Sequence, residues 1–361
     1  MKRILYIVPH RLNRSPGQRF RCEHFIPILQ QNGYEITYSN IISEWDDKYF
    51  YQEGKYLFKT FIFIKTFIHR CWDVIRAPKY DCIFIYREAF MIGTTQFERG
   101  LKRSKRPIIF DFDDSIWIQD ISEGNKNLSW MKRPSKTDEI ISLADLVIVG
   151  NQYLAEHAKT FCSNVAIIPT TIDTNYHKPT NKTTHSTVCI GWTGSETTIR
   201  HFKLIIPVLK RLKEKYGDRI SFSQISNVPY DVPEIGLNAI TWTPQNEISE
   251  LEKFDIGIMP LPNDEWAKGK CGFKGLQYMA MEIPTIMSPV GVNTEIIQDG
   301  VNGFFASNEE EWFSVLCRLI EDNELRATIG KKGRETVIER YSIESQKKKY
   351  VQLFDDLTQK R

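Results

Sequence analysis

Residues 275–291 read GLQYMAMEIPTIMSPVG, a helix-like run that breaks at Pro284 into a short strand-like run ending before Gly291. Proline cannot continue a helix, and glycine permits a sharp turn, so these two residues predict a helix, a strand and a loop in that order. The same change from helical to strand pattern recurs along the whole chain, and it decides the fold class.

Short apolar runs alternate with helix-period segments throughout the first half of the chain. Helices are expected over about 21–32 and from Tyr56 onward. The apolar runs are RILYIVP from Arg3, YEITYS from Tyr34, YDCIFIYR from Tyr80, PIIFDFD from Pro107, ADLVIVG from Ala144 and NVAIIP from Asn164. This order is typical of a parallel sheet covered by helices on both faces, which predicts a doubly wound, Rossmann-like α/β domain over 1–175.

The pattern restarts after a polar, unperiodic segment over 174–187 that we interpret as a linker. The second series of strands is VCIGWTG from Val188, RISFSQIS from Arg219, AITWT from Ala239 and DIGIMPLP from Asp255, with helices over about 198–216 and 248–253. A second Rossmann-like domain is therefore predicted over 187–340, followed by a helix over 341–361. Open α/β sheets bind ligands at the carboxyl ends of their strands.

Composition excludes several classes of protein. Lys and Arg number 48 against 45 Asp and Glu, and a net charge of +3 does not indicate a nucleic-acid binder. The seven cysteines are scattered singly, without a CxxC pair, which predicts neither a disulfide framework nor a zinc site and fits a cytoplasmic protein. The N-terminal apolar run, Ile4 to Val8, is too short for a signal peptide and reads as a first strand.

The longest apolar stretch, residues 56–75, is interrupted by five charged or ionisable residues and is not expected to span a membrane. Two interpretations remain open. One is an amphipathic helix partly buried in the core. The other is peripheral contact with the inner face of a membrane, where Lys and Arg face anionic lipid and aromatic side chains enter the headgroup layer: Phe61, Phe63, Phe67 and Trp72.

A phosphate pocket is predicted where the strand ending at Pro260 leads into the helix that begins near Phe273. The connecting loop holds Lys268, Gly269, Lys270 and Gly272. Glycines let the backbone approach a ligand, and free amides at a helix N-terminus with nearby lysines attract a diphosphate. Further on, Glu295 follows a turn, where its carboxylate can accept hydrogen bonds from ribose or sugar hydroxyls.

The segment from Pro260 to Phe304 resembles the C-terminal signature of retaining glycosyltransferases of the GT-B fold, glycosyltransferase family 4. The matching residues are Met279, Ala280, Pro284, Thr285, Ile286, Gly291, Glu295, Asp299, Gly300, Asn302, Gly303 and Phe304. The resemblance in domain order covers nearly the whole chain. It implies that the two domains face a cleft, that the last helix packs back on the first domain, and that this segment lines a nucleotide-sugar pocket.

The chain departs from that family where Gly269 and Gln277 stand in place of two glutamates, and where Glu282 replaces the usual glycine. We expect the Gln277 amide to contact the ribose. The usual lysine is also missing from GWTGSETTIRHF, so Arg200, Lys270 and Lys274 are the candidates to meet the diphosphate charge. The predicted donor-binding residues are Gly17, Gly194, Ser195, Arg200, Trp242, Gly272, Phe273, Gln277, Gly291 and Glu295, with Trp242 as a flat wall beside the base.

The acceptor side is assigned to the first domain. The resemblance places the loop around Gly17 near the donor phosphates and the acceptor, and Arg19 and Arg21 in that region suit an acidic or phosphate-bearing acceptor. Asp113 or Asp114, at the end of the strand from Pro107, could orient the acceptor hydroxyl. The predicted catalytic residues are thus Asp113, Asp114, Lys270 and Lys274.

The stretch PIIFDFDDSIW, residues 107–117, also allows two other interpretations. Asp111, Asp113 and Ser115 match the opening motif of haloacid-dehalogenase-type phosphatases, with Asp111 as nucleophile, and Asp111 and Asp113 match the metal-binding DxD of GT-A glycosyltransferases. Three strands precede the motif, whereas the phosphatase motif normally opens its domain. A GT-A fold would leave the second half of the chain unexplained.

The predicted reaction is transfer of a sugar from a nucleotide-diphosphate sugar to an acceptor hydroxyl with retention, in cell-surface polysaccharide or glycan assembly. The leaving diphosphate can take the acceptor proton, so no side-chain nucleophile is needed, and growing charge is met by lysines and helix amides. No cofactor and no metal are expected beside the nucleotide sugar, and the partners are a glycan or lipid-linked acceptor, with the protein a monomer or weak dimer. The alternatives are a sugar-nucleotide-binding partner that has lost catalysis and the magnesium-dependent phosphatase.

Overall fold

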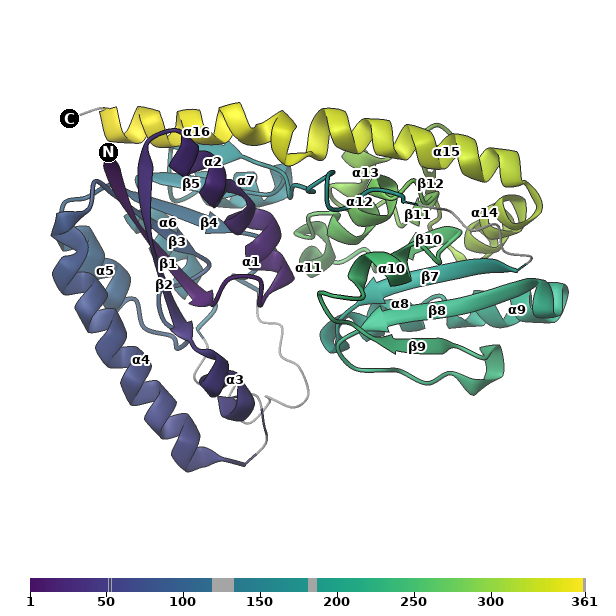
Figure 1. Ribbon diagram of the computed structural model, residues 1–361, viewed down its shortest axis with the longest axis horizontal. Helices are drawn as coiled ribbons and strands as arrows, with labels where there is room; N and C mark the ends of the chain where they lie inside the picture. Colours follow the sequence, from purple (N-terminus) through teal and green to yellow (C-terminus); the bar gives the residue numbers. More distant parts are fainter. Residues whose placement is uncertain (51, 53, 119–132, 181–186, 360–361) are drawn as a thin grey trace. The chain divides into compact units, whose positions relative to one another are not determined.

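A computed structural model describes residues 1–50, 52, 54–118, 133–180 and 187–359. The chain divides into two compact units, one of residues 1–170 with the segment from Gln346 onward, and one of residues 171–345. Each unit contains a six-stranded parallel sheet with helices (Figure 1). The predicted fold class, two doubly wound α/β domains, is therefore confirmed.

The sheet of unit 1 has the order β2-β1-β3-β4-β5-β6, and every neighbouring pair is parallel. The inner strands are buried throughout because helices cover both faces, which is why their sequences are apolar runs rather than alternating ones. The strands are β1 (Lys2–His10), β2 (Tyr34–Ile42), β3 (Cys82–Tyr86), β4 (Ile108–Phe112), β5 (Leu146–Val149) and β6 (Val165–Ile167).

The first predicted helix, 21–32, begins earlier than expected and is divided by a 3-10 turn, with Pro27 at the start of its second part. The C-terminal helix α16 packs in unit 1, where the Tyr350 ring stacks on Phe25 at 3.9 Å. The helices of this unit are α1 (Pro16–Arg21), α2 (Ile26–Gln31), α3 (Glu44–Phe50), α4 (Tyr56–Arg76), α5 (Gln96–Arg103), α6 (Lys136–Leu143), α7 (Gln152–Lys159) and α16 (Ile343–Gln359), with 3-10 turns η1 (Glu23–Phe25) and η2 (Ala77–Lys79).

The sheet of unit 2 has the order β12-β11-β10-β7-β8-β9, again with parallel neighbours. Its strands are β7 (Val188–Gly194), β8 (Ile220–Ser226), β9 (Asn238–Thr241), β10 (Ile256–Met259), β11 (Thr285–Met287) and β12 (Phe304–Phe305). Its α-helices are α8 (Ile199–Lys203), α9 (Ile206–Tyr216), α10 (Glu247–Leu251), α11 (Glu265–Lys268), α12 (Phe273–Ala280), α13 (Asn293–Ile296), α14 (Glu309–Glu321) and α15 (Asn323–Thr336). The shorter helical turns are η4 (Glu196–Thr198), η5 (Gly217–Arg219), η6 (Pro233–Ile235) and the π-helical η7 (Val337–Tyr341).

The segment predicted as a linker from Thr174 is packed on unit 2 as far as Thr180, while residues 181–186 lie outside the described residues. The Arg334 guanidinium donates to the backbone oxygens of His177 at 2.9 Å and Thr174 at 3.1 Å. Tyr176 donates through its hydroxyl to the Pro244 oxygen at 3.1 Å. Polar composition alone suggested a free connection, but these long-range hydrogen bonds tie the segment down.

Candidate functional site

The predicted donor residues of unit 2 gather at one edge of its sheet. Strands β11, β10 and β7 are adjacent and parallel, so the loops that follow them, 288–292, 260–272 and 195–198, leave from the same edge. This is the edge where open α/β sheets bind ligands.

Side-chain contacts bind these loops to one another. The Lys274 ammonium, at the start of α12, lies 5.0 Å from the ring centre of Trp192 in β7. The backbone amide of Thr193 donates to the Tyr278 hydroxyl at 2.6 Å. A Cβ on Gly272 would lie 2.2 Å from Ile296, so α12 and α13 approach closely at that glycine. The structure therefore brings together the segments that carry Gly194, Ser195, Gly272, Phe273, Lys274, Gly291 and Glu295.

The cationic groups at this edge suit an anionic ligand. Gly272 caps α12 with φ of +68°, no acidic residue occupies the first turn, and Lys274 lies within it. Lys270 lies in the preceding loop with its ammonium 5.3 Å from the Trp266 ring centre, and Arg200 is exposed on α8. Helix amides and two half-buried lysines can stabilise a diphosphate, and the exposed Glu295 carboxylate can accept from hydroxyl groups.

Gln277 is placed differently from its prediction. Its side chain is 3% exposed, and its amide nitrogen lies 2.6 Å from a Glu247 carboxylate oxygen and 3.1 Å from Nε2 of the buried His177. We therefore correct its assignment from ribose contact to a polar cluster inside unit 2, because its amide is already engaged there. Glu247 and His177 lie 30 and 100 residues away, so no local pattern linked them to Gln277.

Trp242 follows β9, which is the edge strand at the far end of the strand order from β11 and β12. It is half-buried and packs on a cluster that includes Leu251, Phe254 and Tyr278. Its amide donates to the Ser226 oxygen at 2.8 Å. One part of the ring therefore completes the core, and only the remainder is accessible to a base.

The predicted acceptor-side carboxylates lie beside Gly17 in unit 1. Asp113 accepts hydrogen bonds from the Tyr86 hydroxyl at 2.7 Å and from Arg87 Nε at 2.8 Å, and Arg87 also donates to Asp114 at 2.8 Å. A Cβ on Gly17 would lie 2.9 Å from the Tyr86 oxygen and 3.2 Å from an Asp113 oxygen. The glycine thus lets its loop approach the carboxylate closely.

Arg87 is the residue that sequence reasoning missed in this cluster. It directly follows β3 and has φ of +60°, which is uncommon for a residue other than glycine. Burial alone would raise the pKa of Asp113, but the Arg87 guanidinium and the Tyr86 hydrogen bond lower it to about 2. Asp113 is therefore ionised at neutral pH, which suits a group that accepts a hydrogen bond and holds a hydroxyl in place.

The prediction that Arg21 contacts the acceptor is wrong. Its side chain is 1% exposed and forms two hydrogen bonds to the fully buried Asp111, at 3.1 and 2.9 Å, and one to the Ile168 oxygen. Arg19 is also buried, with its guanidinium 4.4 Å from the Phe20 ring centre. The same ion pair excludes Asp111 as an accessible phosphatase nucleophile.

An open groove of about 590 Å³ lies elsewhere in unit 1 and contains none of the predicted site residues. It is lined by Phe63, Ile92, Gly93, Thr94, Thr95, Arg99, Arg133 and Glu139. Arg99 and Arg133 both pair with Glu139 there, at 3.2 and 2.6 Å, so both cations of the groove are already engaged by a carboxylate, with a net charge of +1. Its chemistry does not indicate the nucleotide site.

Gly291 is expected to be essential for the loop that follows β11. It has φ of +54°, and a Cβ would lie 2.5 Å from the Lys268 carbonyl oxygen. Gly300 has φ of +70° but only one atom within 4 Å of such a Cβ, at 4.0 Å. Gly300→Ala should cost about 1 kcal/mol through backbone strain, whereas Gly291→Ala should cost about 3 kcal/mol because overlap with a backbone atom is added. Urea unfolding measures the loss of stability in both variants. Equal losses would show that the loop shifts to accommodate the added methyl group at Gly291.

Comparisons with known proteins agree with this architecture. Residues 188–322 match the family model described as glycosyl transferases group 1. Three solved structures, each 13% identical to this chain, have a similar fold. Sucrose-phosphate synthase (tll1590) from Thermosynechococcus elongatus has a TM-score of 0.73 over 100% of both chains, and a glycosyltransferase from Rickettsia africae ESF-5 has a TM-score of 0.70 over 100% of this chain and 99% of that one. Anabaena Alr3699/HepE in complex with UDP-glucose has a TM-score of 0.67 over 99% of this chain and 100% of that one. No curated protein sequence matches the chain.

The family match falls on unit 2 and includes the strand edge at which the predicted donor residues gather. The structural similarity extends over both units. Residues 188–322 are therefore similar to group 1 glycosyl transferases, and the chain as a whole has the GT-B fold.

Proposed function

We propose that the protein transfers a sugar from a nucleotide-diphosphate sugar to an acceptor hydroxyl with retention of configuration. The observation that carries this proposal is the cationic edge of unit 2, where the amide end of α12, Lys270 and Lys274 occur within the residues that match the family. HepE, which has a similar fold, was crystallised with UDP-glucose, and this supports a nucleotide sugar as the donor.

In the proposed reaction the bond between the anomeric carbon and the diphosphate oxygen breaks, and the acceptor oxygen bonds to the same face of the sugar. The acceptor proton passes to an oxygen of the leaving diphosphate. Lys270, Lys274 and the first amides of α12 stabilise the charge that grows on the diphosphate. Asp113 accepts a hydrogen bond from the acceptor hydroxyl and orients it, since a carboxylate with a low pKa is a poor base.

The acceptor we propose is a hydroxyl of a glycan or lipid-linked saccharide in cell-surface polysaccharide assembly. The buried positions of Arg19 and Arg21 remove the earlier reason for an acidic acceptor. Hydroxyl recognition in unit 1 then depends on the Asp113, Asp114 and Arg87 cluster.

Thermal shift with a panel of nucleoside diphosphates and their sugars, without added metal, tests the donor site. A ligand at about 100 times its Kd adds about 2.7 kcal/mol to stability, so the matching nucleotide should raise Tm by several degrees. Glu295→Ala should reduce this shift, whereas Glu214→Ala, an exposed position on α9, should not.

Three outcomes separate the candidate functions. A shift followed by transfer to a saccharide acceptor supports the proposal. A shift with no transfer to any acceptor indicates a sugar-nucleotide-binding protein without catalysis. No shift with any nucleotide contradicts the donor site.

A further inference from the structure

Helix α4 presents its apolar side chains outward and its polar side chains inward. Its buried residues are Ile62, Thr66, Arg70 and Asp73, of which only one is apolar. Nine large hydrophobic side chains of the same helix are between 40% and 87% exposed: Tyr56, Leu57, Phe58, Phe61, Ile64, Phe67, Ile68, Trp72 and Ile75. A helix on the surface of a globular protein normally has the opposite arrangement. The exposed face is therefore not explained by packing within unit 1.

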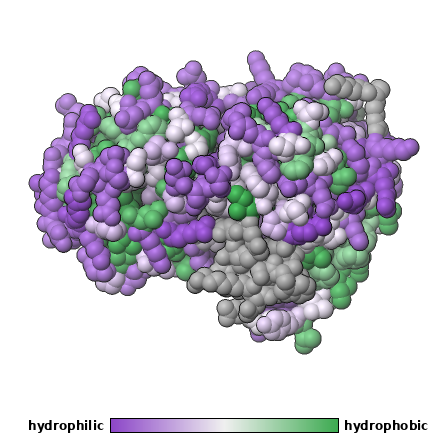
Figure 2. Space-filling view, turned by 180° about the vertical axis from the view of Figure 1, so that it is seen from behind, coloured by the Kyte–Doolittle hydropathy of each residue, from purple (hydrophilic) through white to green (hydrophobic). Residues whose placement is uncertain are grey.

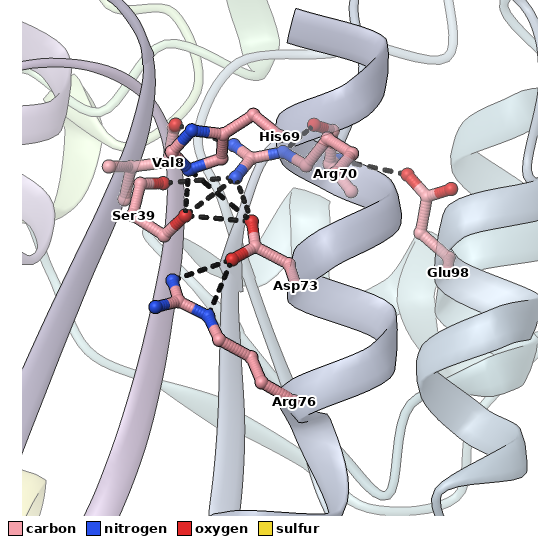
Figure 3. A network of polar contacts seen from close by, with 8 residues as sticks. Val8, Ser39, His69, Arg70, Asp73, Arg76 and Glu98 are labelled. Carbon is pink, nitrogen blue, oxygen red and sulfur yellow. Dashed lines mark hydrogen bonds and ion pairs between the residues drawn. The ribbon is translucent and has the colours of Figure 1, made fainter.

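A buried polar network holds α4 in this rotation (Figure 3). The fully buried Arg70 guanidinium donates to the backbone oxygens of Ala89 at 2.5 Å and Val8 at 2.9 Å, and to the Asp73 carboxylate at 2.6 Å. Asp73 also accepts from the Ser39 hydroxyl at 2.7 Å. Rotating α4 to bury its apolar face would expose or separate the Arg70 and Asp73 side chains. The backbone oxygens of Val8 and Ala89 would then lose their hydrogen-bond donor. The outward apolar face is thus fixed by the fold.

The exposed apolar residues form one continuous stripe along α4. Leu57, Phe61, Ile64, Ile68 and Ile75 fall at spacings of three, four or seven residues, which places them on one side of the helix. The helix has 21 residues and is about 31 Å long. In the view from behind, hydrophobic surface follows the lower right edge, on the side of the molecule where α4 runs (Figure 2). A surface of this length is far larger than one isolated apolar side chain.

The part of the sequence that carries this stripe has an excess of basic residues, while Lys65 of α4 pairs with Asp46 of the neighbouring α3. Residues 55–106 contain twelve Lys and Arg against four Asp and Glu, a net charge of +8, so the remainder of the chain carries −5 to give the total of +3. The one acidic residue of α4, Asp73, is fully buried. The exposed cations Lys55 and Lys79 adjoin the two ends of α4, and Arg103 is exposed at the end of α5, which packs beside it.

We propose that α4 lies in the surface of a bilayer that contains anionic lipids, with its apolar stripe among the acyl chains and the neighbouring cations at the headgroups. In the described part of the chain, every helix lacks the combination of length and apolar character that spanning a bilayer requires. A second copy of the chain fits less well, because pairing α4 with itself in either direction would bring cationic ends together. The anionic lipid surface satisfies both the apolar and the cationic features. This inference is independent of the proposed function, because the residues that carry it lie in unit 1.

Sedimentation with vesicles tests the proposal on the full chain. The wild type should bind vesicles of phosphatidylcholine with phosphatidylglycerol, bind phosphatidylcholine alone more weakly, and lose binding as salt rises. The triple variant Phe61→Ser, Ile64→Ser, Ile68→Ser should bind the anionic vesicles at least about tenfold more weakly than the wild type, because it removes the centre of the stripe. The matched control is Leu204→Ser, Val228→Ser, Ile338→Ser, which replaces three exposed apolar residues of unit 2 and should bind as the wild type does.

Absence of wild-type binding to anionic vesicles, or equal binding by the triple variant, would overturn the proposal. Sedimentation velocity without lipid tests whether a second copy of the chain covers the stripe instead. If the wild type is a dimer and the triple variant is a monomer, the stripe is a dimer interface and the membrane proposal is wrong. The nucleotide thermal shift is measured on every variant. An unchanged shift shows that unit 2 is intact, so that failure at the membrane is distinguished from failure of the donor site.

Discussion

Arg21→Met is expected to lower the free energy of unfolding by about 3–5 kcal/mol, because it leaves the Asp111 carboxylate buried without its cation. Both side chains of this pair are at most 1% exposed. Arg21 also donates to the Ile168 oxygen, so the pair joins α1 to β4 and to the segment after β6. Urea unfolding of the full chain measures the loss, and Arg103→Met, an exposed position, should change stability by no more than about 0.5 kcal/mol.

The pH dependence of this variant identifies the cause. Burial raises the pKa of Asp111 from 3.8 to about 6, although Arg21 beside it acts in the opposite direction. A carboxyl with a raised pKa in the folded state stabilises the fold at low pH, and this contribution disappears as pH rises from about 4 to about 6. Loss of Arg21 raises that pKa further. The destabilisation should therefore be smaller at about pH 5 than at about pH 8.

A double variant distinguishes a buried charge from lost packing. Arg21→Met with Asp111→Leu should be more stable than Arg21→Met alone, because no carboxylate then remains buried without a partner. Equal stability of the single variant and the wild type would mean that the pair is accessible to water.

Lys274→Met is expected to reduce kcat for sugar transfer by about 10²–10³, the usual effect of removing one group that stabilises developing charge. Lys274 lies in the first turn of α12, with its ammonium 5.0 Å from the Trp192 ring centre. In the proposed reaction the positive charge of Lys274 stabilises the transition state most strongly, because negative charge grows on the diphosphate as it leaves. The loss should therefore appear mainly in kcat and only weakly in KM for the donor.

A neighbouring lysine provides the control for this experiment. The Lys268 ammonium pairs with Glu265 at 2.6 Å on α11, so Lys268→Met should leave kcat within about twofold of the wild type. Lys274→Arg should retain more activity than Lys274→Met, because the positive charge remains. A Lys274→Met enzyme with wild-type kcat would remove this lysine from the mechanism and leave Lys270 and Arg200 as the candidate cations.

Sequence pattern predicted the architecture well because each strand and helix is a local feature. Apolar runs such as YDCIFIYR became buried parallel strands, and the order of strands and helices required two doubly wound sheets. The loop that leads into α12 was also predicted, since glycines and lysines before a helix are visible in sequence. Once the strands are parallel neighbours, their following loops must lie at the same edge.

The sequence by itself therefore determined the fold class and the cationic edge of unit 2, because both follow from local periodicity and from the order of elements. Tertiary structure alone decided which polar residues are buried: Arg21 pairs with a carboxylate 90 positions away, and Gln277 with one 30 positions away. It also decided that α4 faces outward with its apolar side, because the Arg70 and Asp73 network fixes the rotation of a helix that hydrophobic pattern would have turned inward. Burial depends on partners distant in sequence, and no local pattern contains them.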